Sequence, residues 1–277
     1  MNIEDLISHS PFLARFDRLV SSIVFGNHSR THNNLIGIIR LLKIGVNPIK
    51  RFFQPGIELL DFSDLPINQI YKHLGQPCYY NTEADKLLVS SVVVYDYKSQ
   101  TNKYLDLKMS FYDLVSSSQA FSLISLKYYN SRARILSIEL EERLTPMSEK
   151  HNHSLHSSHY VKHTIYSEGL HFDRLPIDQG RVYITLKDLA PISGGGTLYC
   201  NRLQSLIASF LGSCLGVSRH SALWGRMAGF LHNHIRPSQF SGQAGSGLFF
   251  ATPLNLHSGA RPDAGSTRIV LRFLLSA

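Results

Sequence analysis

Three residues in the second half of the chain have the types and spacing of a metal site. His171 and Asp173 are separated by one residue. In an extended segment, residues i and i+2 point to the same side, so an imidazole and a carboxylate can reach one ion. A second imidazole is available from His257, which follows the strand-like segment 247–253. Two histidines and one carboxylate leave open positions on the metal, as non-haem Fe(II) chemistry with O₂ requires.

An arginine completes this set at the start of the last apolar segment. Arg268 lies 11 residues after His257. A guanidinium presents a fork of donors that matches a carboxylate. The four residues are therefore the parts needed to hold iron and a chelating molecule of 2-oxoglutarate together. Arg261 and Arg272 compete for the carboxylate, and the spacing favours Arg268.

At these residues the sequence resembles the Fe(II)/2-oxoglutarate-dependent dioxygenases, in particular the phytanoyl-CoA dioxygenase-like branch. The resemblance covers residues 85–277, whereas the first 80 residues show nothing diagnostic. It implies a double-stranded β-helix, with His171, Asp173 and His257 holding Fe(II) and Arg268 pairing with 2-oxoglutarate. Beyond the ligands, three segments resemble the branch's ligand segment, following strand and turn: 169–174, 182–189 and 194–198.

The resemblance also implies a reaction. The family uses O₂ to decarboxylate 2-oxoglutarate to succinate and CO₂ and couples this to oxidation of a substrate. We therefore expect a hydroxylase-type oxidoreductase that acts on a small molecule in natural-product or other specialised biosynthesis. Desaturation and ring closure are alternative outcomes. Asp173 argues against a halogenase, because relatives that place chloride on iron usually have Gly or Ala there.

Two features depart from the family pattern. The turn that usually continues into Pro-Gly-Ser-His reads Leu-Tyr-Cys-Asn at 198–201. Gly259 stands where some relatives place a Ser or Thr that helps to hold 2-oxoglutarate. The second oxoglutarate anchor therefore stays open among four candidates: Tyr160, Lys162, Thr164 and Thr185.

Most of the other histidines are interpreted without a metal. The chain has 14 histidines, and the densest group lies at and just after the polar segment 147–159, which we interpret as a solvated loop. His232 and His234 have the spacing that begins a cupin-type site, but the acidic residue that this pattern needs a few positions later is absent. They define an alternative function, a cupin-like isomerase or binding protein without oxoglutarate chemistry, in which His232, His234 and His257 hold a different metal.

The elements that must position these residues follow from apolar periodicity. Helical spacing predicts helices over 5–26 and 33–45, and cap candidates at 61–64 predict a short helix ending at Leu74. Many short strands after these helices indicate an α+β fold with a jelly-roll core. Strand-like segments are 87–97, 122–129, 135–140, 160–166, 181–186, 197–199, 247–251 and 267–274.

We expect one domain over 1–277. Residues 1–84 form a mainly helical part packed on the sheet, and 85–277 form the jelly-roll core with a helical insertion at 201–236. The composition of 43% hydrophobic and 17% charged residues over 277 positions is globular and excludes a disordered chain.

The composition and charge of the sequence also argue against several other classes of protein. Three cysteines without a CxxC pair predict neither a disulfide framework nor a cysteine-ligated zinc site. We expect a cytoplasmic monomer or homodimer without stable membrane insertion, because no signal peptide or apolar span is evident. The net charge of +8 comes from scattered residues without a nucleic-acid motif, so we expect no nucleic-acid partner. A basic helix over 35–52 leaves a lipid-surface module as a further alternative.

Overall fold

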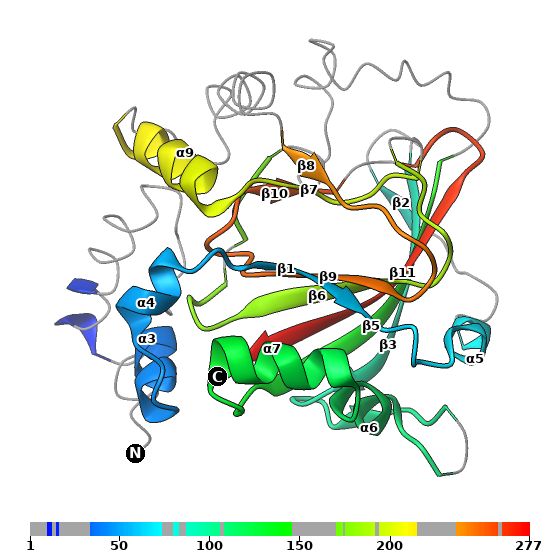
Figure 1. Ribbon diagram of the computed structural model, residues 1–277, viewed down its shortest axis with the longest axis horizontal. Coiled ribbons are helices and arrows are strands. Elements are labelled where there is room, and N and C mark those ends of the chain that lie inside the picture. Colours follow the sequence, from blue (N-terminus) through cyan, green and yellow to red (C-terminus); the bar gives the residue numbers. More distant parts are fainter. Residues whose placement is uncertain are drawn as a thin grey trace.

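The computed structural model describes residues 10–12, 15–16, 34–73, 80–82, 87–105, 108–145, 170–173, 175–191, 194–214, 237–259 and 262–277. Its centre is a large antiparallel sheet of eight strands (Figure 1). Seven of them follow one another in the order β1 (Ile57–Asp61), β9 (Ser246–Phe250), β6 (Gly180–Thr185), β11 (Thr267–Ser276), β5 (Arg134–Leu144), β3 (Leu87–Asp96) and β2 (Tyr80–Thr82). The eighth, β4 (Thr101–Asn102), pairs with β3.

A smaller sheet lies above the large one in Figure 1. It contains β10 (His257–Ser258), β7 (Leu198–Tyr199) and β8 (Ser238–Gln239) in that order. A single bridge between His171 and His257 extends its β10 edge. The predicted combination of helices with a large antiparallel sheet is confirmed, and the full double-stranded β-helix remains a prediction.

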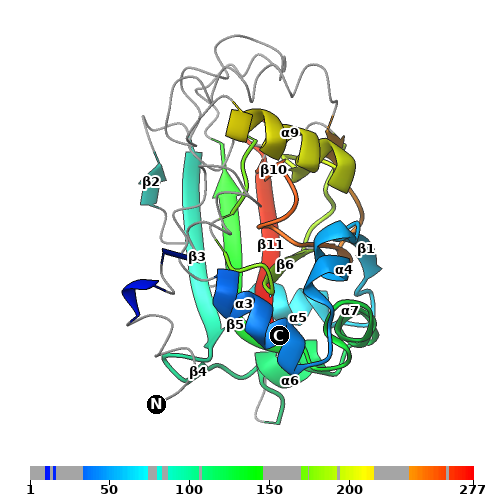
Figure 2. The same cartoon turned by 90° about the vertical axis from the view of Figure 1, so that its left-hand side faces the viewer.

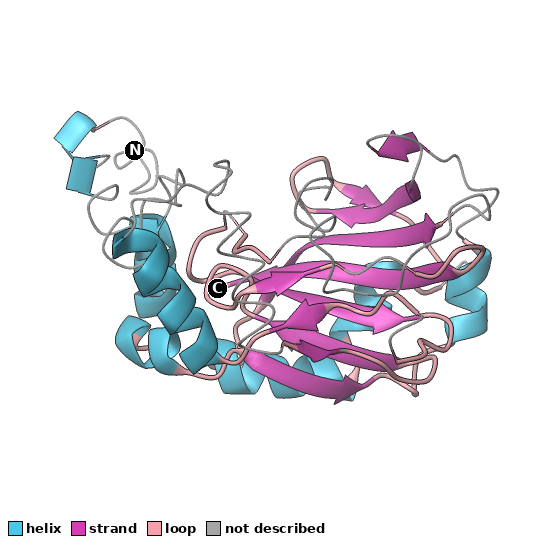
Figure 3. Ribbon diagram, turned by 90° about the horizontal axis from the view of Figure 1, so that it is seen from above, coloured by secondary structure: helices cyan, strands magenta, loops and turns pink. Residues whose placement is uncertain are grey.

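Helices cover the outer side and the margins of the strands. α6 (Phe111–Ser116) and α7 (Gln119–Tyr129) lie below the large sheet, on the side opposite the small sheet (Figure 1). Viewed from above, helices lie to the left and to the right of the strands (Figure 3). α9 (Arg202–Cys214) lies at the end occupied by α3 (Asn34–Lys43) and α4 (Pro48–Phe53), as Figure 2 shows. Arg202 on α9 there donates a hydrogen bond of 2.7 Å to the Phe52 carbonyl.

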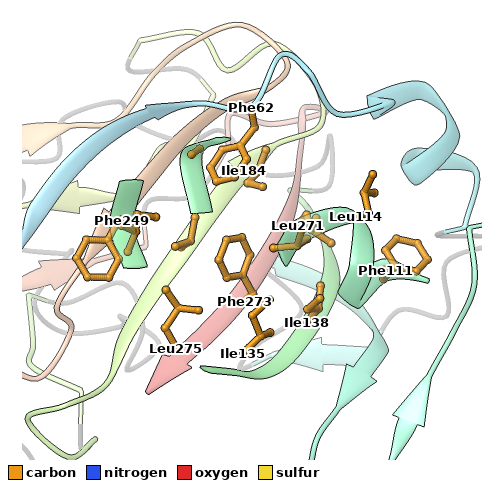
Figure 4. Close-up of a cluster of buried hydrophobic side chains, with 14 of the residues drawn as sticks. Phe62, Phe111, Leu114, Ile135, Ile138, Ile184, Phe249, Leu271, Phe273 and Leu275 are labelled. Atoms are coloured by element: carbon orange, nitrogen blue, oxygen red, sulfur yellow. The ribbon is translucent and has the colours of Figure 1, made fainter. Parts of the chain in front are cut away.

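The strand alternation of β11 separates an apolar core from a polar inner face. Ile269, Leu271, Phe273 and Leu275 point into the main core, which lies between the large sheet and its helices (Figure 4). The ring of Phe273 meets that of Phe62 edge-on at 6.1 Å. The alternate residues, including Arg268 and Arg272, point to the other side, because successive side chains of a strand face opposite ways. The large sheet thus presents charged side chains toward the small sheet.

The predicted strand over 122–129 is wrong, because these residues form helix α7. Ser118 caps this helix, and its hydroxyl accepts a hydrogen bond from the Phe121 amide. Ala120, Ile124 and Tyr128 recur every four residues and are buried. A short apolar run fits either a strand or a buried helix. The cap and the packing surface of the sheet decide for the helix.

The basic segment 35–52 is not one helix. α3 ends at Lys43, and α4 begins after Asn47, whose side chain accepts hydrogen bonds from the Ile49 and Lys50 amides. The predicted short helix also begins later than expected: α5 (Ile67–Lys72) follows Pro66 and has no side-chain cap.

The other strand predictions within the described residues are confirmed as β3, β5, β6, β7, β9 and β11. Helix α3 and the beginning of the helical insertion, α9, are also confirmed. Several predictions fall outside the described residues: the loop 147–159, the strand 160–166, the pair His232 and His234, and most of the helix 5–26. Among the described helices, none has the length and apolar character that crossing a membrane needs.

Candidate metal centre

His171 and His257 are brought together by backbone pairing. The His171 amide donates to the His257 carbonyl at 2.8 Å, and the reverse bond measures 3.0 Å. Residues directly opposite in an antiparallel pair have side chains on the same face. The two imidazole rings accordingly lie 4.5 Å apart between centroids. Residues 86 positions apart in the sequence thereby provide two neighbouring nitrogen ligands.

Asp173 faces both rings. Its Oδ1 lies 3.6 Å from the Nε2 of His171 and 3.6 Å from the Nε2 of His257. The Asp173 amide donates a hydrogen bond of 3.1 Å to the Thr252 carbonyl, which holds this segment beside the strand connection. One ligand atom from each of the three residues lies within 4.8 Å of the others. Because metal bonds of about 2.1 Å reach ligand atoms up to about 4 Å apart, one ion fits the 3.6 Å separations.

The tautomer of His257 suits a metal ligand. Its Nδ1 lies 2.9 Å from the Asn255 carbonyl oxygen, which only accepts hydrogen bonds. Nδ1 therefore donates this bond, so in the neutral ring the lone pair is on Nε2, the atom that faces Asp173. A histidine that ligates a metal is usually oriented by such a bond from its other nitrogen. His171 and His257 are both buried, with 6% and 5% exposure, so the two imidazoles are shielded from bulk water.

The charge on Asp173 is stabilised by its surroundings. Burial alone raises the pKa of this carboxyl, but His257 and Arg181 outweigh burial, so the pKa lies well below its usual range. Arg181 provides an ion pair of 3.1 Å between its Nε and the Asp173 Oδ2. An ionised carboxylate beside two imidazoles is the donor set used by non-haem Fe(II) sites that activate O₂.

Arg268 lies between the two sheets without an acidic partner. It is 3% exposed, and within the described part of the chain no carboxylate forms an ion pair with it. Its guanidinium donates to the Gly195 carbonyl and to the Thr197 hydroxyl, both at 3.1 Å, while Nε has no hydrogen-bond partner. Burial lowers the pKa of Arg268 to about 10. A buried cation without a directly paired carboxylate is costly, so this position favours an anionic ligand.

A series of ring contacts connects Arg268 to the metal ligands. The Arg268 guanidinium carbon lies 5.5 Å from the centroid of the Tyr183 ring, which stacks on Phe250 at 5.4 Å. The Phe250 ring in turn lies 4.8 Å from the His257 ring. Thr197 approaches Arg268 from the side of the small sheet. It lies two residues before Tyr199, which pairs with His257.

The structure separates Arg268 from its competitor Arg272. Arg272 pairs with the Oε2 atoms of Glu139 and Glu141, the latter at 2.9 Å. Glu141 also binds Arg143 at 2.8 Å. These pairs already neutralise Arg272, whereas Arg268 keeps its charge for a ligand. Arg261, the other alternative, lies outside the described residues.

Sequence reasoning missed two residues at this site. Thr197 contacts Arg268, and Arg181 contacts Asp173. Among the sequence candidates for a second oxoglutarate anchor, Thr185 uses its hydroxyl to donate to the Gln243 carbonyl at 2.8 Å. The other three candidates, Tyr160, Lys162 and Thr164, lie outside the described residues. No local pattern marks Thr197 or Arg181, because each acquires its role through a contact with a distant segment.

Neither a protein-family model nor a curated protein matches the sequence. Among solved structures, the chain is similar to the non-haem α-ketoglutarate-dependent epimerase SnoN from nogalamycin biosynthesis, with 11% identity and a TM-score of 0.49 over 82% of this chain and 80% of that chain. The carbocyclase SnoK from the same biosynthesis is 14% identical, with a TM-score of 0.45 over 83% of this chain and 82% of that chain. A third similar structure is HygX from Streptomyces hygroscopicus, crystallised with nickel, 2-oxoglutarate and hygromycin B. It is 12% identical, with a TM-score of 0.45 over 83% of this chain and 86% of that chain. Likenesses at this level assign no activity to the chain.

Proposed function

We propose that this protein is a non-haem Fe(II)- and 2-oxoglutarate-dependent oxygenase that hydroxylates a small molecule, in natural-product or other specialised biosynthesis. His171, Asp173 and His257 hold the iron, and Arg268 holds the far carboxylate of 2-oxoglutarate. The observation that carries the proposal is the buried Arg268 guanidinium, which has no acidic partner among the described residues and is linked through Tyr183 and Phe250 to the two-histidine, one-carboxylate set.

The donor chemistry fits this metal. Two imidazole nitrogens and one carboxylate oxygen occupy one side of an ion and leave positions for a chelating 2-oxo acid and O₂. Bound Fe(II) supplies the activation of O₂ that couples decarboxylation of 2-oxoglutarate to oxidation of the substrate. The similar structures include an epimerase and a carbocyclase, so ring closure stays among the alternative outcomes.

The remaining residues orient the co-substrate. Arg268 neutralises the far carboxylate, and a two-point pair with its guanidinium sets the direction in which the 2-oxo acid end points. Thr197 accepts a hydrogen bond from Arg268, so its own hydroxyl proton is free to be donated to the same carboxylate. Phe250 and Tyr183 line the path between Arg268 and His257 with apolar rings, which strengthens these charge interactions by limiting water.

Turnover of 2-oxoglutarate tests the proposal. Purified protein is incubated with Fe(II), ascorbate and 2-oxoglutarate, alone and with candidate substrates, and succinate is measured. We expect succinate above the level of Asp173→Ala, whereas Asp64→Ala, which removes an exposed carboxylate before α5, behaves as wild type. Calorimetric titration of 2-oxoglutarate into Ni(II)-loaded protein provides a second readout. Absence of both succinate release and 2-oxoglutarate binding in metal-loaded wild type contradicts the proposal.

A further inference from the structure

The two carboxylate oxygens of Asp173 have different neighbours. Oδ1 faces the Nε2 atoms of His171 and His257, at 3.6 Å from each. Oδ2 lies 3.1 Å from the Nε of Arg181, in an ion pair that lacks hydrogen-bond geometry. The carboxylate therefore has one oxygen directed to the candidate metal position and the other directed to a fixed positive charge.

Arg181 is well placed to hold this orientation. It lies in β6, between Phe250 of β9 and Leu274 of β11, so its backbone is paired on both sides. Its side chain is 28% exposed and that of Asp173 is 16% exposed. Within the described residues, Asp173 is the one acidic group paired with Arg181. A partly buried pair on a paired strand is less screened and less mobile than a surface pair.

The number of carboxylate oxygens on the metal matters for the proposed function. A carboxylate binds an ion through one oxygen or through both. In a six-coordinate ion, three single-atom protein ligands leave three positions, two for the 2-oxo acid and one for O₂. A second oxygen from Asp173 would occupy one of these positions.

We infer that Arg181 is a positioning residue that keeps Asp173 a one-oxygen ligand by holding Oδ2 away from the metal. The inference rests on the proposed function for its consequence, the binding of 2-oxoglutarate, but the coordination mode of Asp173 can be measured separately. Arg181 does not touch the reacting groups in this role. It acts through Asp173.

Difference infrared spectra of Ni(II)-loaded against metal-free protein test the inference, because the separation of the carboxylate stretches distinguishes one-oxygen from two-oxygen coordination. The metal-loaded forms are also titrated calorimetrically with 2-oxoglutarate. In wild type we expect the one-oxygen signature. In Arg181→Met we expect the two-oxygen signature, Ni(II) affinity equal to or higher than that of wild type, and 2-oxoglutarate affinity at least tenfold lower.

Two further variants complete the design. Arg181→Lys keeps a positive charge on the same strand and is expected to restore the one-oxygen signature. Arg134→Met removes a charge from an exposed position at the start of β5 and is expected to match wild type. A two-oxygen signature in wild type, or an unchanged signature in Arg181→Met, overturns the inference. A one-oxygen signature in wild type that changes in Arg181→Met, without 2-oxoglutarate binding to either protein, supports the role of Arg181 and contradicts the proposed function.

Discussion

Arg268 on β11 donates a hydrogen bond of 3.1 Å to the hydroxyl of Thr197, which lies 71 residues earlier in the chain. The bond joins the large sheet to the segment that enters β7 of the small sheet. It leaves the Arg268 Nε without a partner and the Thr197 hydroxyl proton free to be donated. The two side chains together place a buried positive charge beside a hydroxyl donor, which neither segment provides alone.

Replacing Arg268 tests the charge in this pair. We expect Arg268→Gln to weaken 2-oxoglutarate binding to Ni(II)-loaded protein about 100-fold, since losing a buried charged partner costs about 3 kcal/mol. Ni(II) affinity is expected to stay within threefold of wild type, because Arg268 is not a ligand. Arg268→Lys keeps the charge but loses the fork, so it should bind with intermediate affinity. Calorimetry measures both constants, and equal 2-oxoglutarate affinity in Arg268→Gln and wild type refutes the assignment.

Thr197 tests the hydrogen bond rather than the charge. Thr197→Val preserves the shape of the side chain and removes its hydroxyl, leaving Arg268 with one acceptor fewer. We expect 2-oxoglutarate affinity to fall about tenfold, the size of one hydrogen bond to a charged group. Thr197→Ser keeps the hydroxyl and should retain most of the affinity. If Thr197→Val and Thr197→Ser bind equally, the hydroxyl has no part in binding.

Metal binding is expected to stabilise the fold. A ligand that binds only the folded state at 100 times its Kd adds about 2.7 kcal/mol, which raises the Tm of a chain of this size by about 5 °C. We expect this rise when Ni(II) is added to protein freed of metal with EDTA, measured by calorimetric or fluorescence melting. Asp173→Ala should lose it, and Asp64→Ala should keep it. A Tm rise of the same size in Asp173→Ala places the metal elsewhere.

The loss of folding stability at acid pH is expected to depend on Glu141. Burial raises the pKa of this carboxyl, but Arg143, Arg272 and Arg268 lower it more, from 4.5 to about 2. The folded pKa is below the unfolded value, so the contribution is complete above pH 4.5 and is lost as the pH falls toward 2. Wild type should therefore lose on the order of 3 kcal/mol more than Glu141→Gln between pH 5 and pH 2. Urea unfolding across this range measures the difference, and parallel curves contradict it.

Phe273 is expected to contribute strongly to the stability of the main core. Its ring is 1% exposed and packs edge-on against Phe62. Phe273→Ala should lower the free energy of unfolding by about 3–5 kcal/mol, through lost burial and the cavity that remains. Leu126→Ala on α7, where the side chain is 64% exposed, should change it by less than about 0.5 kcal/mol. Denaturant unfolding compares the two variants, and similar losses would place Phe273 outside the main core.

The local sequence pattern was sufficient to predict most of the strands. Alternation of apolar residues over 135–140 predicted β5, because a strand exposes every second side chain to the same face. Strand signals over 181–186, 247–251 and 267–274 predicted β6, β9 and β11. The single-residue spacing of His171 and Asp173 also placed an imidazole and a carboxylate together, and both are found at the candidate metal centre. The prediction for segment 122–129 failed because a short segment rich in apolar and aromatic residues fits either a strand or a buried helix.

What the sequence determined by itself was therefore most of the strand pattern and the pairing of His171 with Asp173 as candidate ligands, both of which are set by residues close along the chain. The spacing already favoured Arg268 over Arg272, but only the tertiary structure showed the partners of each arginine. Both have the chemistry to bind a carboxylate, but pairing of β11 with β5 neutralises Arg272 with Glu139 and Glu141. It likewise brought Thr197 to Arg268 and Arg181 to Asp173. The physical reason is that a charge acquires its role from the groups facing it across the sheets, and no spacing along one strand records them.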